Sequence, residues 1–202
     1  MAPQASMTTE VIAEHIALPA PRKSGGMPLF TALAERHSVR NFRTEPIPRA
    51  VLSELLWAAF GINRPVSGDR TAPYWRHVMV IDLYLAKEDG VWIYDPKAHA
   101  LHRAVTDDIR KDTGMQDFVA TAPIELLYVA HGERMDVPAE ERRLYAAVDA
   151  AFIGQNVYLC CASEGLGTVF RGSFDQTKLA RLLHLAKDQF VTFVQTIGYP
   201  SR

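Results

Sequence analysis

Apolar residues recur along the chain at the three- and four-residue spacing of amphipathic helices in four places. The predicted helices are residues 28–37, the segment between Pro48 and Gly61, the segment between Pro138 and Gly165, and a short segment capped by Asp175. In the third of these, apolar residues lie nearly all round the helix. We therefore expect it to be buried on more than one side, in a core or a dimer interface.

Short runs rich in β-branched and aromatic residues predict the strands. They are residues 77–84, 91–94, 100–105, 124–130, 166–170 and 190–197. Asp95 and Pro96 supply a turn that joins the second and third runs as a hairpin. Because helices and strands do not alternate regularly, the pattern favours an α+β fold, with a mostly antiparallel sheet flanked by helices, over a doubly wound parallel sheet.

The first 26 residues differ in composition from the rest of the chain. They are rich in Pro, Ser and Gly, with one short apolar patch formed by Val11, Ile12, Ile16 and Leu18. This composition predicts an N-terminal arm over residues 1–26 that lies outside the core and could wrap a partner subunit. Residues 27–202 then form a single domain, since a chain of 202 residues that is 48% hydrophobic can bury one sizeable core.

Charge and composition exclude several classes of function. Lysine and arginine number 22 against 23 acidic residues, so the chain lacks the basic excess that nucleic-acid binding requires. We find neither a run of about 20 apolar residues nor a basic, then apolar leader, and we expect a cytoplasmic protein that does not enter membranes. Cys160 and Cys161 are adjacent, which disfavours an ordinary disulfide, and no residues have the spacing of metal ligands.

The densest group of polar residues begins where the first predicted helix ends. Arg36, Ser38 and Arg40 alternate there, and in an extended segment this spacing places all three side chains on one side. Two guanidinium groups and a hydroxyl so arranged could bind one phosphate. From composition alone, the commoner explanation of such residues is a solvated helix end with cations near its negative pole.

Five stretches, in order along the chain, resemble the nitroreductase family of flavoproteins. Residues 36–42 are similar to the family signature R-[RH]-S-x-R-x-F. The other four are residues 56–64 with 70–73, residues 118–123, residues 149–156 with 165–168, and the Gly-Tyr-Pro ending at residues 198–202. Together they extend from about Pro28 to the end of the chain, which makes the resemblance far more specific than any single motif.

The resemblance implies a nitroreductase-like fold and an intertwined homodimer that holds FMN at its interface. It assigns the FMN phosphate to Arg36, Ser38, Arg40 and Arg202. His37 would lie beside the ribityl chain, although a histidine here is also an ordinary helix-end residue.

The resemblance also assigns residues to the flavin ring. Phe170, Arg171 and Gly172 would lie against the ring and offer a main-chain N–H to flavin N5, where hydride is accepted. A plain turn after a strand would explain the same three residues. Gln116 would reach the pyrimidine edge of the ring.

One segment departs from the family pattern. After Pro73, where the family has small or polar residues, this chain has Tyr74 and Trp75. These aromatic side chains could narrow the pocket over the ring and favour flat substrates, or they could be surface or interface residues.

The function that the resemblance implies is transfer of hydride from NADH or NADPH, through FMN, to a small organic acceptor such as a nitroaromatic compound or a quinone, in a ping-pong cycle. The flavin then carries out the electron chemistry, while the protein orients the reactants and excludes water, and no catalytic acid or base is assigned. Two alternatives stay open: a specialised flavoenzyme of the same fold (azoline dehydrogenase, dehalogenase or flavin-cleaving enzyme), or a flavin-binding dimer without catalysis.

Overall fold

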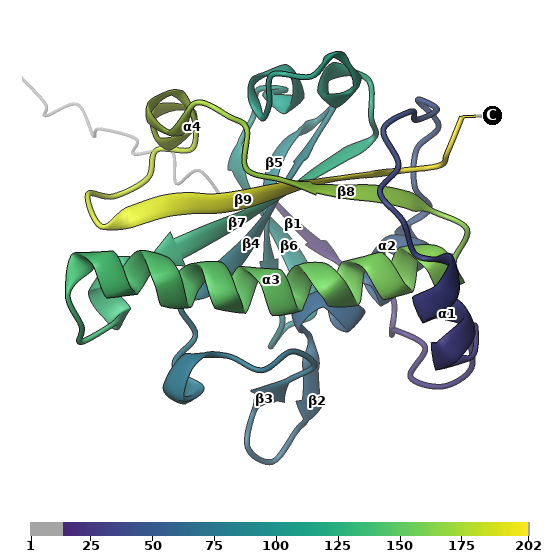
Figure 1. Ribbon diagram of the computed structural model, residues 1–202, viewed down its shortest axis with the longest axis horizontal. Helices are drawn as coiled ribbons and strands as arrows, with labels where there is room; N and C mark the ends of the chain where they lie inside the picture. The colour runs from purple at the N-terminus through teal and green to yellow at the C-terminus, as the bar shows by residue number, and fades with distance from the viewer. Residues whose placement is uncertain (1–13, 202) are drawn as a thin grey trace, which may run out of the picture.

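The computed structural model describes residues 14–201, which form an α+β fold around a seven-stranded sheet (Figure 1). The strands of this sheet are β1 (His15–Ala17), β4 (Ile81–Lys87), β5 (Gly90–Asp95), β6 (Ala100–Val105), β7 (Ile124–His131), β8 (Gly167–Arg171) and β9 (Gln189–Gly198). Their order across the sheet is β1-β6-β5-β4-β7-β9-β8, and every neighbouring pair is antiparallel. The predicted fold class is confirmed.

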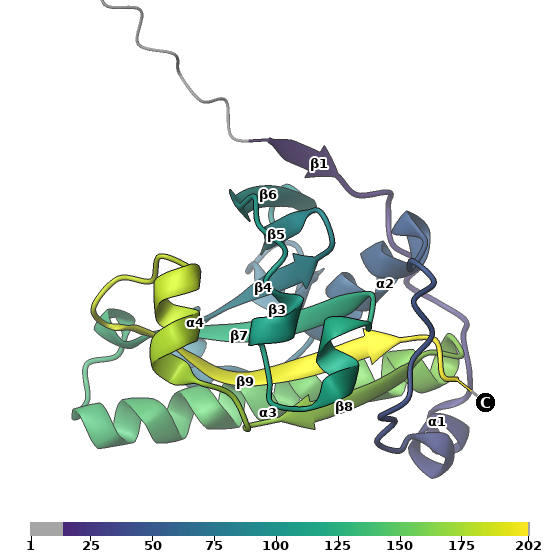
Figure 2. The same ribbon diagram turned by 90° about the horizontal axis from the view of Figure 1, so that it is seen from above.

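Helices cover both faces of the sheet, which Figure 1 shows nearly along its edge and Figure 2 shows roughly face on. They are α1 (Leu29–Glu35), α2 (Arg49–Phe60), α3 (Ala139–Ser163) and α4 (Gln176–Leu182). Helices α2 and α3 pack in the larger core, and α4 packs in a second core on the opposite face. Strand β7 is buried along its whole length because alternate residues enter each core: Leu126 and Tyr128 the larger, Leu127 and Val129 the smaller.

The predicted helix ends are close to the observed ones. Helix α2 ends at Gly61, where a Cβ atom would lie 2.4 Å from Cδ1 of Trp57 and 2.7 Å from its carbonyl oxygen. Glycine is therefore needed there because of crowding. Asp175 caps α4, its carboxylate accepting a hydrogen bond of 2.9 Å from the backbone N–H of Lys178.

The described part of the N-terminal arm is attached to the sheet, so the expectation that it lies outside the core is wrong for these residues. β1 pairs with β6, and the side chain of Leu18 is buried in the larger core. The imidazole of His99 lies 3.1 Å from the carbonyl oxygen of Pro19 and 2.6 Å from the hydroxyl of Ser53. Val11 and Ile12 lie outside the described residues.

The strand predicted over residues 77–84 begins later, at Ile81. It is preceded by a single 3₁₀ turn, Trp75–His77, in which Arg76 and His77 adopt left-handed backbone angles with φ of 43° and 61°. Such angles are unfavourable for residues other than glycine and break a strand. A short hairpin, β2 (Ile62–Arg64) with β3 (Asp69–Arg70), precedes this turn and was not predicted.

Helix α3 is buried on one side only within the chain. By length and composition alone its 25 residues could cross a membrane, a property that it shares with core helices of folded domains. Its inner face, with Ala146, Ala150 and Ile153, packs in the larger core, as in a core helix of a folded domain. Leu144, Val148 and Phe152 are exposed on the other side, so the expected second buried side is not formed within one chain.

Candidate functional site

The segment that follows α1 runs in extended form along β8. Arg36 ends the helix with extended backbone angles, and Ser38 forms a parallel bridge with Thr168 of β8. The N–H of Val39 donates to the carbonyl oxygen of Thr168 at 2.9 Å. We call residues 36–40 the arginine turn; its extended backbone is the conformation that the alternation of arginine and serine predicts.

Two of the predicted phosphate ligands meet at Tyr158 of α3. The hydroxyl of Ser38 lies 2.8 Å from the hydroxyl of Tyr158, and the guanidinium group of Arg36 stacks over the Tyr158 ring at 4.9 Å. The buried Nε of Arg36 has no hydrogen-bond partner within the described chain. Arg40 is exposed and forms no ion pair with any described residue. The arginine turn therefore has donor groups available for an anion.

His37 is exposed, and its Nδ1 lies 2.8 Å from the carbonyl oxygen of Glu35. This contact satisfies a carbonyl group at the end of α1, so the structure gives His37 at least the helix-end role.

The carboxyl-terminal end of the chain lies next to the arginine turn. Phe42 bridges Pro200, and the N–H of Ser201 donates to the carbonyl oxygen of Asn41 at 3.0 Å. Arg202 lies outside the described residues, so its assignment to the phosphate stays a prediction.

The predicted ring-side residues lie at the end of β8. The N–H of Phe170 donates to the hydroxyl of Tyr158 at 3.0 Å, and the Phe170 ring packs on Phe193 with centroids 4.5 Å apart. Gly172 follows the strand and is exposed. Tyr158 thus joins the arginine turn to the ring-side segment, a link that the sequence did not reveal because Tyr158 lies among apolar residues of a long helix.

The side chain of Arg171 points into the protein and not toward the candidate site. It forms an ion pair of 2.5 Å with Glu125, and both side chains are almost fully buried. Its guanidinium group also donates to the carbonyl oxygen of Thr113 at 3.1 Å and lies 3.5 Å from Oε1 of Gln116. Arg171 therefore ties the loop carrying Gln116 to β8, and of this residue only the backbone is left to face a flavin ring.

Burial and ion pairing shift the pKa of Glu125 in opposite directions. Burial raises the pKa of its carboxyl group to about 7, although the charge of Arg171 and the hydroxyl of Thr196 favour the ionised form. Its second oxygen, Oε1, is buried without a partner in the described chain.

Pro73, Tyr74 and Trp75 lie away from the arginine turn. The Trp75 ring packs on Tyr145 with centroids 5.8 Å apart, at the other end of α3 from Tyr158. Thirteen residues of helix separate the two tyrosines, which is about 20 Å at 1.5 Å per residue. Within one chain, the structure does not bring the Pro73–Trp75 segment to the other predicted site residues.

The Trp75 segment is held by two carboxylates. The N–H of Trp75 donates to Oδ2 of Asp149 at 3.0 Å, and the hydroxyl of Tyr74 donates to Asp69 at 2.7 Å. Burial raises the pKa of Asp149 to about 6. Neither carboxylate belongs to the predicted site, since no local pattern in the sequence shows that Asp149 of α3 or Asp69 of β3 contacts this segment.

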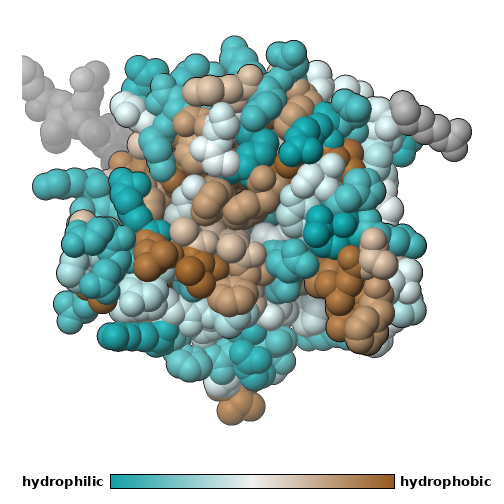
Figure 3. Space-filling view, viewed as in Figure 1, coloured by the Kyte–Doolittle hydropathy of each residue, from teal (hydrophilic) through white to brown (hydrophobic). Residues whose placement is uncertain are grey.

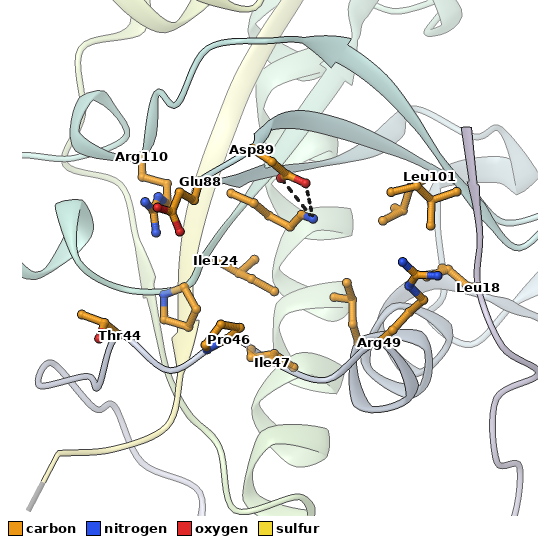
Figure 4. A pocket seen from close by; sticks show the side chains of 14 residues that line it. Leu18, Thr44, Pro46, Ile47, Arg49, Glu88, Asp89, Leu101, Arg110 and Ile124 are labelled. Atoms are coloured by element: carbon orange, nitrogen blue, oxygen red, sulfur yellow. Dashed lines mark hydrogen bonds and ion pairs between the residues drawn. The ribbon is translucent and has the colours of Figure 1, made fainter. Parts of the chain in front are cut away.

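One cavity of the described chain lies at the arginine turn, and another lies apart from the predicted site residues. A cavity of about 190 Å³ lies beside Arg36, His37 and Tyr158. Another cavity, of about 430 Å³, lies elsewhere and is lined by none of the predicted site residues. Figure 4 shows it between Arg49 on one side and Arg110 with Glu88 on the other.

Comparison with known proteins shows which family the chain is similar to. The sequence profile described as the nitroreductase family matches residues 33–199. A protein of Methanocaldococcus jannaschii classed as a nitroreductase is 30% identical over 168 residues, which cover 78% of this chain and 84% of that protein.

Two solved structures extend the comparison. A Ralstonia eutropha protein classed as a nitroreductase superposes with a TM-score of 0.89 and 43% identity, over 93% of this chain and 90% of that one. The NADPH:FMN oxidoreductase of Vibrio harveyi has a TM-score of 0.65 and 20% identity, over 86% and 69% of the two chains, and at this identity it supports the fold alone.

Proposed function

The chain belongs to the nitroreductase family, and we propose that it binds FMN and transfers hydride from NADH or NADPH to a small organic acceptor such as a nitroaromatic compound or a quinone. As a member of this family the chain is an enzyme, a flavin-dependent oxidoreductase. The observation that carries the finer proposal is the arginine turn, which runs along the start of β8 and in which Nε of Arg36 and the guanidinium group of Arg40 have no partner among the described residues.

The residues present fit the phosphate of FMN. A phosphate carries about −1.5 to −2 charges and requires several fixed donors. Arg36 offers a buried Nε that has no partner among residues 14–201, Ser38 offers a hydroxyl, and Arg40 offers an exposed guanidinium group. When bound, FMN supplies the hydride chemistry, while the chain binds, orients and shields it.

We also propose that the active form is a homodimer, because one chain cannot complete the site. The arginine turn and Trp75 lie about 20 Å apart along α3 in the same chain, whereas a second copy could bring its own Trp75 segment to the first copy's arginine turn.

The exposed apolar surface supports this pairing. Leu144, Val148 and Phe152 follow one another at four-residue intervals on the outer face of α3, and α1 exposes Leu29, Phe30 and Leu33, with Phe30 85% exposed. Figure 3 shows apolar groups along α3 and over α1 on the same face of the molecule. Apolar patches of this kind mark protein interfaces.

Flavin titration followed by anaerobic reduction tests the proposed cofactor. We expect purified protein to bind FMN and the bound flavin to lose its visible absorbance on addition of NADH or NADPH. Arg40→Gln should weaken FMN binding by about tenfold, the effect of losing one charged hydrogen bond. Arg181→Gln, on α4, should leave it unchanged. A wild-type protein that binds no FMN would refute the proposal.

Steady-state kinetics tests the acceptor. Turnover with menadione or nitrofurazone, with the parallel-line pattern of a ping-pong cycle, is the expected result. Tight FMN binding without turnover of either acceptor would support the flavin-binding dimer instead.

Sedimentation velocity tests the dimer. Phe152→Glu places a charge in the exposed apolar face of α3, and we expect it to yield monomers that bind FMN poorly. Val66→Glu changes a fully exposed apolar residue at the tip of the β2–β3 hairpin and should remain dimeric. A wild-type protein that sediments as a monomer with FMN bound would contradict the dimer.

A further inference from the structure

We propose that Tyr158 is a positioning residue that holds both Arg36 and Ser38 ready for the phosphate of FMN, an inference that rests on the function proposed above. Tyr158 lies on α3, 120 residues from Ser38 in sequence, and contacts both groups of the arginine turn. It does so with two different parts of its side chain, so their effects can be separated by substitution.

The hydroxyl of Tyr158 determines whether the Ser38 hydroxyl is free to donate a hydrogen bond to a ligand. The N–H of Phe170 is a donor only, so the Tyr158 oxygen accepts that bond and keeps its own proton to donate. The group within reach is the Ser38 hydroxyl, 2.8 Å away. When Ser38 accepts this proton, its own O–H is left to donate outward, which is the arrangement that an anion requires.

The ring of Tyr158 supports Arg36. The guanidinium group lies 4.9 Å from the ring centroid, within the range of a cation–π contact. Stacking of this kind limits the rotamers of a long side chain, so less conformational entropy is lost when its N–H groups bind a ligand. The Nε of Arg36, which has no partner in the described part of the chain, belongs to this stacked side chain, and Arg36 and Tyr158 both line the 190 Å³ cavity.

The contacts of Tyr158 exceed what packing alone requires. The residue is half-buried near the end of α3, where phenylalanine would fill nearly the same space beside the apolar side chains that line the cavity, Val39 and Leu166 among them. A hydroxyl at this position instead completes a chain of hydrogen bonds from Phe170 through Tyr158 to Ser38.

Titration of two flavins into two variants tests the proposal. Riboflavin is FMN without the phosphate, so it measures every contribution of the pocket except the phosphate contacts. Tyr158→Phe keeps the ring and removes the hydroxyl, and we expect it to raise the Kd for FMN about fivefold to tenfold while changing the Kd for riboflavin less than about twofold. Tyr158→Leu also removes the stacking on Arg36 and should raise the Kd for FMN about threefold further.

Two controls separate positioning from a general loss of structure. Tyr84→Phe removes a tyrosine hydroxyl that makes no hydrogen bond within the described chain and should leave both affinities unchanged. Ser38→Ala alone should weaken FMN binding. In protein that already carries Tyr158→Phe it should weaken FMN binding much less, because the hydroxyl of Tyr158 acts through Ser38.

The outcomes are distinguishable. An equal loss for FMN and riboflavin in Tyr158→Phe would mean that the hydroxyl only supports the fold or acts through Phe170, and unchanged binding of both would mean that it does nothing for the phosphate; either result overturns the inference and leaves the proposed function standing. If wild-type protein binds neither flavin, the proposed function is overturned, and this inference with it.

Discussion

Replacing Asp149 by asparagine should stabilise the protein at pH 8 and have little effect near pH 4. Asp149 is 3% exposed, and burial raises its pKa from the ordinary value of 3.8 to about 6. The folded state therefore binds this proton more tightly than the unfolded state does, so wild-type protein loses stability as the pH rises from 3.8 through about 6. Asparagine cannot ionise, and its side-chain oxygen can still accept the hydrogen bond from Trp75.

The magnitude follows from the pKa difference. A rise from 3.8 to about 6, at about 1.4 kcal/mol for each pH unit, corresponds to about 3 kcal/mol at pH 8 and to about 0.5 kcal/mol at pH 4. Local relaxation around the carboxylate reduces the larger figure, and we expect Asp149→Asn to raise the free energy of unfolding at pH 8 by about 1 to 3 kcal/mol.

Urea unfolding at pH 4 and pH 8, followed by circular dichroism, measures this difference. Asp107→Asn is the matched control, since Asp107 is exposed and makes no hydrogen bond or ion pair with any described residue. The reasoning is refuted if Asp149→Asn changes stability equally at both pH values. A loss at both would show that the hydrogen bond to Trp75 depends on the carboxylate itself.

Three further substitutions or measurements test other parts of the structure. Arg171→Met leaves the buried carboxylate of Glu125 without its cation and should cost about 3 to 5 kcal/mol at pH 8, and less at pH 5, where protonation relieves the cost; urea unfolding at both pH values is the check. Leu18→Ala should lower the free energy of unfolding by about 2 to 3 kcal/mol, whereas Val66→Ala should lower it by less than about 0.5 kcal/mol. Equal effects would contradict the attachment of the arm to the core. Burial raises the pKa of Cys160 to about 12, so this thiol should react with a thiol reagent at pH 8 far more slowly in folded than in urea-unfolded protein.

Elements that depend on local pattern could be predicted from the sequence. Helices α2 and α3, the β5–β6 hairpin and strands β7, β8 and β9 lie within a few residues of the predicted ranges. Strand β1 could not be predicted, because three residues become a strand only through pairing with β6. The late start of β4 depends on the left-handed angles at Arg76 and His77, which no propensity favours for these residue types.

The candidate site divides in the same way. The arginine turn and the family could be read from the sequence, because both depend on contiguous motifs. The link that Tyr158 makes between Ser38 and Phe170 depends on the folded chain, because it joins residues 120 and 12 positions apart. It also decided that the side chain of Arg171 turns inward, since alternate residues of a strand face opposite sides of the sheet. The Trp75 segment lies far from the arginine turn because the two contact α3 at different places, Trp75 at Tyr145 and Arg36 at Tyr158. These contacts form only in the folded chain, so the sequence does not show them.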